Sequence, residues 1–72
     1  MTPKQLKSVR QKFGLSQAEL ALLIGVASDR TVRRWEEGER DIPGPVIVLM
    51  QLLLRSPEAR MIMGLPDVSG RE

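Results

Sequence analysis

The 72-residue sequence predicts an all-α fold, a compact bundle of about five short helices. Two observations support this prediction. Apolar residues recur at steps of three and four, which is the spacing of one helix face. Most of these apolar segments also follow a residue that caps a helix and precede a glycine that ends one. Residues 1–65 are expected to form a single domain, and residues 66–72 a flexible tail.

The first helix is expected to begin at Thr2. Threonine caps exposed amides, Pro3 suits a first turn, and Gln5 occupies the third position of a capping box. Arg10 is placed to reach Glu36 across the domain, as a structural ion pair. The apolar stripe of this helix is formed by Leu6, Val9 and Phe13.

Residues 16–38 are predicted to contain two short helices that cross at a turn. Ser16 and Glu19 form a second capping box, and Gly25 ends this helix after about two turns. Two helices joined by so few residues cannot lie parallel, so they cross steeply. Ala21 and Gly25 are small, as a close crossing requires. The segment is therefore predicted to be a helix-turn-helix.

The second helix of this pair is expected over residues 29–37, with Ser28 as its cap. At 100° per residue, Val32 and Trp35 share the inward face. The opposite face carries three arginines: Arg30, Arg33 and Arg34. An arginine fork can bridge guanine O6 and N7, so this face is a candidate for contact with DNA bases or phosphates.

A solvated arginine face, with Asp29 and Arg33 paired one turn apart, is the alternative. Contact with DNA is favoured over this alternative for Arg30 and Arg34. Asp29 either accepts a hydrogen bond from cytosine N4 or is placed there by the helix dipole, and the structural role is favoured. Trp35 is assigned to the core, since a single aromatic at a core position is far more often packing.

The start of the earlier helix is a second candidate site. Ser16 and Gln17 begin a helix that is expected to cross the phosphate backbone, and its first-turn amides can bind a phosphate. Ser16 is needed as a cap whatever the function. Lys7 and Arg40 are candidates for additional phosphate contacts.

A fourth helix is predicted over residues 45–54. It is apolar almost all round, with Gln51 its only polar member, so it is expected to be covered on more than one side. One side can face the core while another faces a second copy. Ser56 caps a last short helix, which Gly64 ends. A homodimer is therefore expected through residues 45–54 and Met61–Leu65.

Composition narrows the classes of function. The chain has no cysteine and no histidine, which removes disulfides, the usual zinc ligands and imidazole-based catalysis. An enzyme is therefore remote, and no cofactor is expected. The acids of residues 36–41 match no EF-hand spacing, so a metal site is rejected.

Charge is unevenly placed along the chain. Residues 1–35 hold seven lysines and arginines against two acids, whereas residues 36–72 hold four against seven. A basic half suggests an anionic partner, and a solvated surface with uneven charges is the alternative. No apolar run approaches the roughly 20 residues of a membrane span, and the start lacks the apolar part of a signal peptide. A soluble intracellular protein without a membrane partner is expected.

Three motifs resemble those of one family. They are Leu15-Ser16-Gln17-Ala18-Glu19-Leu20-Ala21, Leu23-Ile24-Gly25-Val26 and Thr31-Val32-Arg33-Arg34-Trp35-Glu36-Glu37-Gly38. They closely resemble the Cro/C1-type (XRE) helix-turn-helix domain of phage repressors and bacterial regulators, over about residues 4–56. The later Ile42-Pro43-Gly44-Pro45 and the leucine-rich helix are similar to small autoregulatory regulators, including the DNA-binding half of some antitoxins.

The resemblance implies a lambda-repressor-like bundle that binds operator DNA as a two-fold dimer. It implies a buried ion pair between Arg10 and Glu36. It also implies roles for the candidate residues. The base-reading positions would be Gln17, Asp29, Arg30 and Arg34, with Arg33 and Ser16 nearer the phosphates.

One departure from the family pattern lies in the turn. Gly25-Val26-Ala27-Ser28 is one residue longer than the usual turn, so either Ser28 or Asp29 caps the next helix. The leading hypothesis is a cytoplasmic, dimeric repressor that reads double-stranded DNA with residues 29–37. The alternative is an antitoxin or accessory subunit whose helices over residues 45–63 mainly bind a toxin or another protein.

Overall fold

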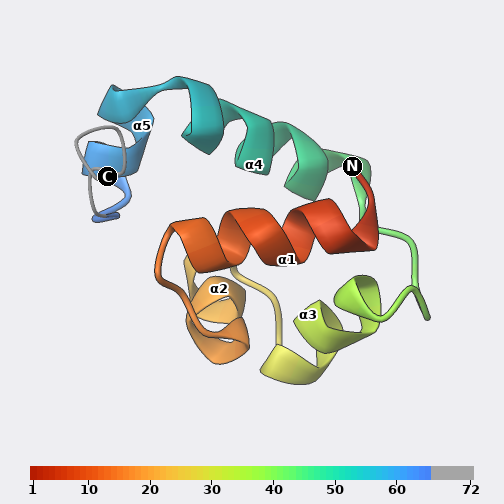
Figure 1. Ribbon diagram of the computed structural model, residues 1–72. Helices are drawn as coiled ribbons and strands as arrows, with labels where there is room; N and C mark the ends of the chain where they lie inside the picture. Colours follow the sequence, from red (N-terminus) through yellow and green to blue (C-terminus); the bar gives the residue numbers. More distant parts are fainter. Residues whose placement is uncertain (66–72) are drawn as a thin grey trace.

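A computed structural model describes residues 1–65, and the regular structure within them is entirely helical. The predicted tail over residues 66–72 lies outside these residues. In Figure 1, α1 runs through the middle, with α2 and α3 on one side and α4 on the other, and α5 folds back at the end of α4. The predicted all-α bundle is confirmed, and no helix in residues 1–65 is long and apolar enough to cross a membrane. The helices are α1 (Pro3–Lys12), α2 (Gln17–Ile24), α3 (Asp29–Glu36), α4 (Gly44–Arg55) and α5 (Pro57–Ile62).

The core lies between α1 and the helices on its two sides. Trp35 is only 4% exposed, which confirms its assignment to the core. Helices this short are marginal in isolation, so the bundle depends on these shared contacts. The largest fully buried side chains are Phe13, Leu6, Leu20, Met50, Leu53 and Val32.

The two predicted capping boxes are present at the starts of α1 and α2. At α1, the Gln5 N–H donates to Thr2 Oγ1 at 3.1 Å, and the Thr2 N–H donates to Gln5 Oε1 at 2.8 Å. At α2, the Glu19 N–H donates to Ser16 Oγ at 3.0 Å, and the Ser16 N–H donates to Glu19 Oε1 at 2.8 Å. The bond from the Ser16 backbone, helped by the Ser16 hydroxyl, lowers the pKa of the Glu19 carboxyl.

Both ends of α3 differ in detail from the prediction. Ser28 occupies the N-cap position, as expected, but its side chain accepts no hydrogen bond from the helix. In a capped helix the Thr31 N–H would donate to the Ser28 hydroxyl. Here it donates instead to the Ser28 carbonyl oxygen at 3.2 Å. The helix ends at Glu36 with Glu37 as its C-cap, one residue earlier than the predicted range 29–37.

A glycine is needed at position 25 because the backbone there, at the end of α2, adopts a left-handed conformation. Its φ is +78°, in the left-handed region that favours glycine at the end of a helix. A Cβ built at Gly25 would meet no heavy atom within 4 Å. The expectation that Gly25 makes room for a close helix crossing is therefore wrong. Ala21, by contrast, is 3% exposed and belongs to the core.

A buried arginine connects α5 to the end of α4. Arg60 is 4% exposed, and its Nη1 donates to the carbonyl oxygens of Leu53 at 2.7 Å and Leu54 at 3.1 Å. The last carbonyls of a helix lack partners within it, and a cation there also favours the helix dipole. Sequence reasoning did not predict this role for Arg60.

Leu65 belongs to the core of the single chain. Gly64 has a φ of +77°, and after it the Leu65 N–H donates back to the Arg60 carbonyl oxygen at 2.8 Å. The Leu65 side chain is 9% exposed and joins the core cluster. The predicted dimer segment Met61–Leu65 is therefore wrong at its last residue.

Candidate nucleic-acid interface

Within residues 1–65, α2 and α3 pack against each other more extensively than any other two helices. Leu20 and Ala21 of α2 are buried, as are Val32 and Trp35 of α3. These faces hold the two helices in the crossed arrangement seen in Figure 1. The predicted helix-turn-helix geometry is thus present.

A hydrogen-bonded ion pair joins α1 to α3, and its arginine also binds the loop before α2. Arg10 Nε donates to Glu36 Oε2 at 2.6 Å, and Arg10 Nη2 donates to Glu36 Oε1 at 3.1 Å. Arg10 Nη1 also donates to the Leu15 carbonyl oxygen at 2.8 Å, in the loop before α2. The two charged side chains are 10% and 3% exposed, so the pair is largely removed from water. The ion pair that the sequence suggested is confirmed.

The outer face of α3 carries its three arginines, as predicted. All three are exposed: Arg30, Arg33 and Arg34. Asp29 is exposed in the first turn of the same helix. Among residues 1–65, neither Asp29 nor any of these arginines forms an ion pair, so the alternative pairing of Asp29 with Arg33 is not formed. Three positive charges therefore face solvent together on one helix.

At the start of α2, both candidate side chains already bind within the protein. The Ser16 hydroxyl accepts the Glu19 N–H, and Gln17 Nε2 donates to Glu36 Oε1 at 3.1 Å. Gln17 retains its carbonyl oxygen and one N–H hydrogen for a further partner. Among the described residues, the backbone N–H groups of Gln17 and Ala18 donate to no internal acceptor. These two amides are suited to bind a phosphate at a helix N-terminus.

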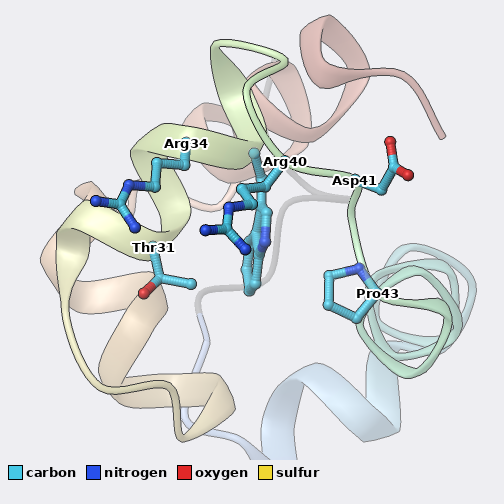
Figure 2. Close-up of a pocket in the computed structure, with 6 residues that line it drawn as sticks. Thr31, Arg34, Arg40, Asp41 and Pro43 are labelled. Atoms are coloured by element: carbon cyan, nitrogen blue, oxygen red, sulfur yellow. The ribbon is translucent and has the colours of Figure 1, made fainter.

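A hollow of about 540 Å³ lies beside α3, where the connection to α4 returns to the helix (Figure 2). Gly38, with a φ of +78°, reverses the chain after α3. The N–H groups of Glu39 and Arg40 then donate to the Arg34 carbonyl oxygen at 2.9 and 3.3 Å. Sequence reasoning named Arg40 as a candidate phosphate contact but missed the hollow, since no spacing shows where a connection folds back. The lining residues are Thr31, Arg34, Trp35, Arg40, Asp41 and Pro43.

Comparison with known proteins agrees with this geometry. The family model described as helix-turn-helix matches residues 6–59, about three quarters of the chain. The chain belongs to the Cro/C1-type helix-turn-helix family. Membership of this family confirms the resemblance found in the sequence, and a helix-turn-helix is a unit that can place its second helix in the major groove of DNA.

A relative of this helix-turn-helix protein is the Antitoxin HigA-2 of Vibrio cholerae serotype O1 (strain ATCC 39315 / El Tor Inaba N16961). The two are 36% identical over 59 residues. The aligned segment covers 81% of this chain and 55% of the relative. The chain therefore spans about half the length of that antitoxin.

Proposed function

We propose that this chain is a sequence-specific regulator that binds double-stranded operator DNA as a homodimer and represses transcription. The observation that carries the proposal is the division of α3 into two faces. Val32 and Trp35 hold the helix to the core, and its arginines are exposed and form no ion pair within residues 1–65. A helix presented in this way fits the major groove. Occupying an operator in the cytoplasm then blocks transcription directly.

The candidate residues divide between bases and backbone in this proposal. Arg30 projects from the exposed face of α3 and is suited to bidentate recognition of guanine. Asp29 and Arg33 flank it on the same helix. Ser16 and Gln17 lie at the start of α2, where free backbone amides favour a phosphate. Glu36 holds the Gln17 side chain through its hydrogen bond at 3.1 Å, so Gln17 is pre-oriented.

Exposed apolar side chains of α4 and α5 support self-association. Val48 is 65% exposed and Leu52 is 51% exposed, and they lie four residues apart on one face of α4. Met61 and Ile62 of α5 are 76% and 84% exposed. Fully burying such side chains contributes about 1.5–3 kcal/mol each, so covering them with a second copy is favourable.

A second candidate function is that of an antitoxin or accessory subunit. The observation that favours it is the similarity to a protein named as an antitoxin. In that case α4 and α5, over residues 45–63, would bind a toxin or another protein in addition to DNA. Homodimerisation accounts for the same exposed side chains without requiring a second kind of protein.

Selection from random duplex DNA tests the first proposal. Enrichment of a two-fold symmetric motif, with half-sites about 34–36 Å apart along the helix axis, is expected for a dimer of this class. Arg30→Ala is expected to weaken binding to the selected operator by about 1–3 kcal/mol and to relax preference at one base pair. Absence of any enriched motif contradicts sequence-specific binding.

Sedimentation separates the two functions. Wild-type protein is expected to sediment as a dimer, and Leu52→Glu to sediment as a monomer with a far-ultraviolet spectrum like that of the wild type. A wild-type monomer, both free and on DNA, contradicts the homodimer. The second function would be supported by a purified toxin that binds the wild-type protein at a stoichiometric ratio and does not bind the Leu52→Glu variant.

A further inference from the structure

Two arginines from different segments share the hollow beside α3. Arg34 comes from the helix and Arg40 from the connection to α4. Both side chains are exposed, and among residues 1–65 neither forms an ion pair. Asp41 also lines the hollow, but its carboxylate points away from both guanidinium groups (Figure 2). The hollow therefore gathers two cations, and within residues 1–65 the one acid that lines it forms no ion pair with either of them.

The main chain enforces this clustering. The Arg34 carbonyl oxygen accepts N–H groups from both Glu39 and Arg40, at 2.9 and 3.3 Å. The positive φ of Gly38 makes that return possible. Arg40 is thus held beside Arg34 by backbone geometry, against the repulsion of two like charges. An anion placed between the two guanidinium groups would relieve that repulsion.

Arg34 also lies on a particular flank of α3. On a wheel of 100° per residue it lies roughly 60° from Thr31 and roughly 40° from Arg30. Arg33 lies roughly 60° from Arg30 on the other side. Arg34 is therefore the arginine nearest the half-buried Thr31, and it faces the hollow where Arg40 arrives.

The chemistry of the hollow favours an oxyanion. Guanidinium forks match the planar, bidentate recognition of phosphate oxygens. A base cannot stack on Trp35 there, because that side chain is 4% exposed. A volume of about 540 Å³ is far more than the roughly 10–15 Å³ that one water needs, so a hydrated phosphate group has room in this open hollow.

A polyanion suits the site better than a free anion. Both arginines are exposed, and an exposed ion pair contributes little by itself. Along DNA the same contact also releases condensed counterions and adds to the contacts made by the rest of α3. A small anion receives neither contribution.

We infer that Arg34 and Arg40 together clamp one phosphodiester of the DNA backbone at the edge of the major groove. The inference rests on the proposed DNA-binding function and deepens it. Arg34 then positions the helix on the duplex, in place of the base-reading role that the family resemblance implied. Base discrimination by α3 falls to Arg30 and Arg33.

Salt dependence of binding tests the clamp on the operator obtained by selection. Each phosphate that a protomer neutralises contributes about 0.9 to the slope of log K against log salt. The double variant should lower the slope by about 0.9 per protomer, and Arg34→Ala and Arg40→Ala should each lower it by no more than that, because both arginines bind the same phosphate. Arg55→Ala, an exposed arginine on α4, is the matched control and should leave the slope unchanged.

A scan with neutral methylphosphonate linkages locates the contact. Neutralising one phosphate in each half-site should weaken operator binding by the wild-type protein and should leave operator binding by the double variant unchanged. Against duplexes with single base-pair changes, Arg34→Ala should weaken every duplex by the same factor. Titration with inorganic phosphate alone should leave the Nε–H resonances of Arg34 and Arg40 unmoved at micromolar concentrations.

Three results would overturn the clamp. A double variant whose slope falls by about 1.8 per protomer, twice the value for one phosphate, would show two separate phosphates. Loss of discrimination at one base pair in Arg34→Ala would show a base contact. Saturation by micromolar inorganic phosphate would assign the site to a free anion. A wild type without preference for any duplex is a different result, which contradicts the proposed function itself.

Discussion

Removing the Glu36 carboxylate is expected to destabilise the whole helix-turn-helix unit. Its side chain is 3% exposed and accepts hydrogen bonds from Arg10 at 2.6 and 3.1 Å and from Gln17 at 3.1 Å. Glu36→Ala leaves Arg10 as a buried cation whose acceptor is the Leu15 carbonyl oxygen, at 2.8 Å. One polar and one charged group then lose their partners away from water.

The expected cost is large relative to the stability of the domain. Breaking a buried ion pair by removing one partner costs about 3–5 kcal/mol, since the other charge stays buried. A chain of 72 residues is stable by about 4–11 kcal/mol, taking about 0.05–0.15 kcal/mol per residue. Glu36→Ala is therefore expected to remove about a quarter or more of the free energy of unfolding. Its exposed neighbour offers a control, and Glu37→Ala is expected to change that free energy by less than about 0.5 kcal/mol.

Urea unfolding, followed by the fluorescence of the single buried tryptophan Trp35, measures these differences. The single variants Arg10→Met and Glu36→Leu and the double variant Arg10→Met/Glu36→Leu form a double-mutant cycle. Replacing a buried pair by apolar side chains is often nearly neutral, so the double variant should cost far less than the sum of the two single variants. A cost below about 1 kcal/mol for Glu36→Ala, or simple additivity in the cycle, would refute the reasoning.

Three further substitutions test other features of the fold. Gly25→Ala should destabilise by about 1–2 kcal/mol in urea unfolding because of the positive φ, whereas Gly44→Ala, in an open helical position, should not. Glu19→Gln should abolish part of the acid dependence of stability. The pKa of Glu19 is lowered in the fold, so its contribution is present above its ordinary value of 4.5 and is lost as pH falls through the lowered value. The melting temperatures of wild type and Glu19→Gln should thus differ most above pH 4.5 and converge as the pH falls below it, and a constant difference would contradict the role. Arg60→Met should cost about 1–3 kcal/mol, measured by thermal unfolding, because two carbonyls at the end of α4 lose their donor.

Local signals in the sequence predicted the helices and their buried faces. Capping boxes and glycines depend on residues three or four apart, and the helices accordingly begin at Pro3 and Gln17 as expected. The inward face of α3 followed from its period alone. Even the contact between Arg10 and Glu36 could be predicted from the sequence, because both residues lie next to core positions on helices that must pack together.

Contacts that depend on how helices are placed in space were not predictable in this way. The Gln17 side chain reaches Glu36 only because α2 crosses the end of α3. Arg60 is buried because α5 folds back onto the last carbonyls of α4, and an arginine is otherwise expected to be exposed to solvent. Leu65 enters the core after one left-handed glycine. Each of these depends on a chain reversal whose direction periodicity does not specify.

The two ends of α3 are held by different means, which explains how this chain tolerates the extra residue in its turn. At the end of the helix, Glu36 is bonded to two other helices, and the Arg34 carbonyl oxygen accepts two N–H groups from the connection. At the start, Ser28 makes no side-chain cap, and Ala27 is exposed in a bend. An insertion at the start therefore displaces few contacts, while one at the end would break the buried ion pair. It follows that the end of α3 that carries Arg34 is the more firmly held end, and that changes in the turn act mainly on the first turn of the helix, at Asp29 and Arg30.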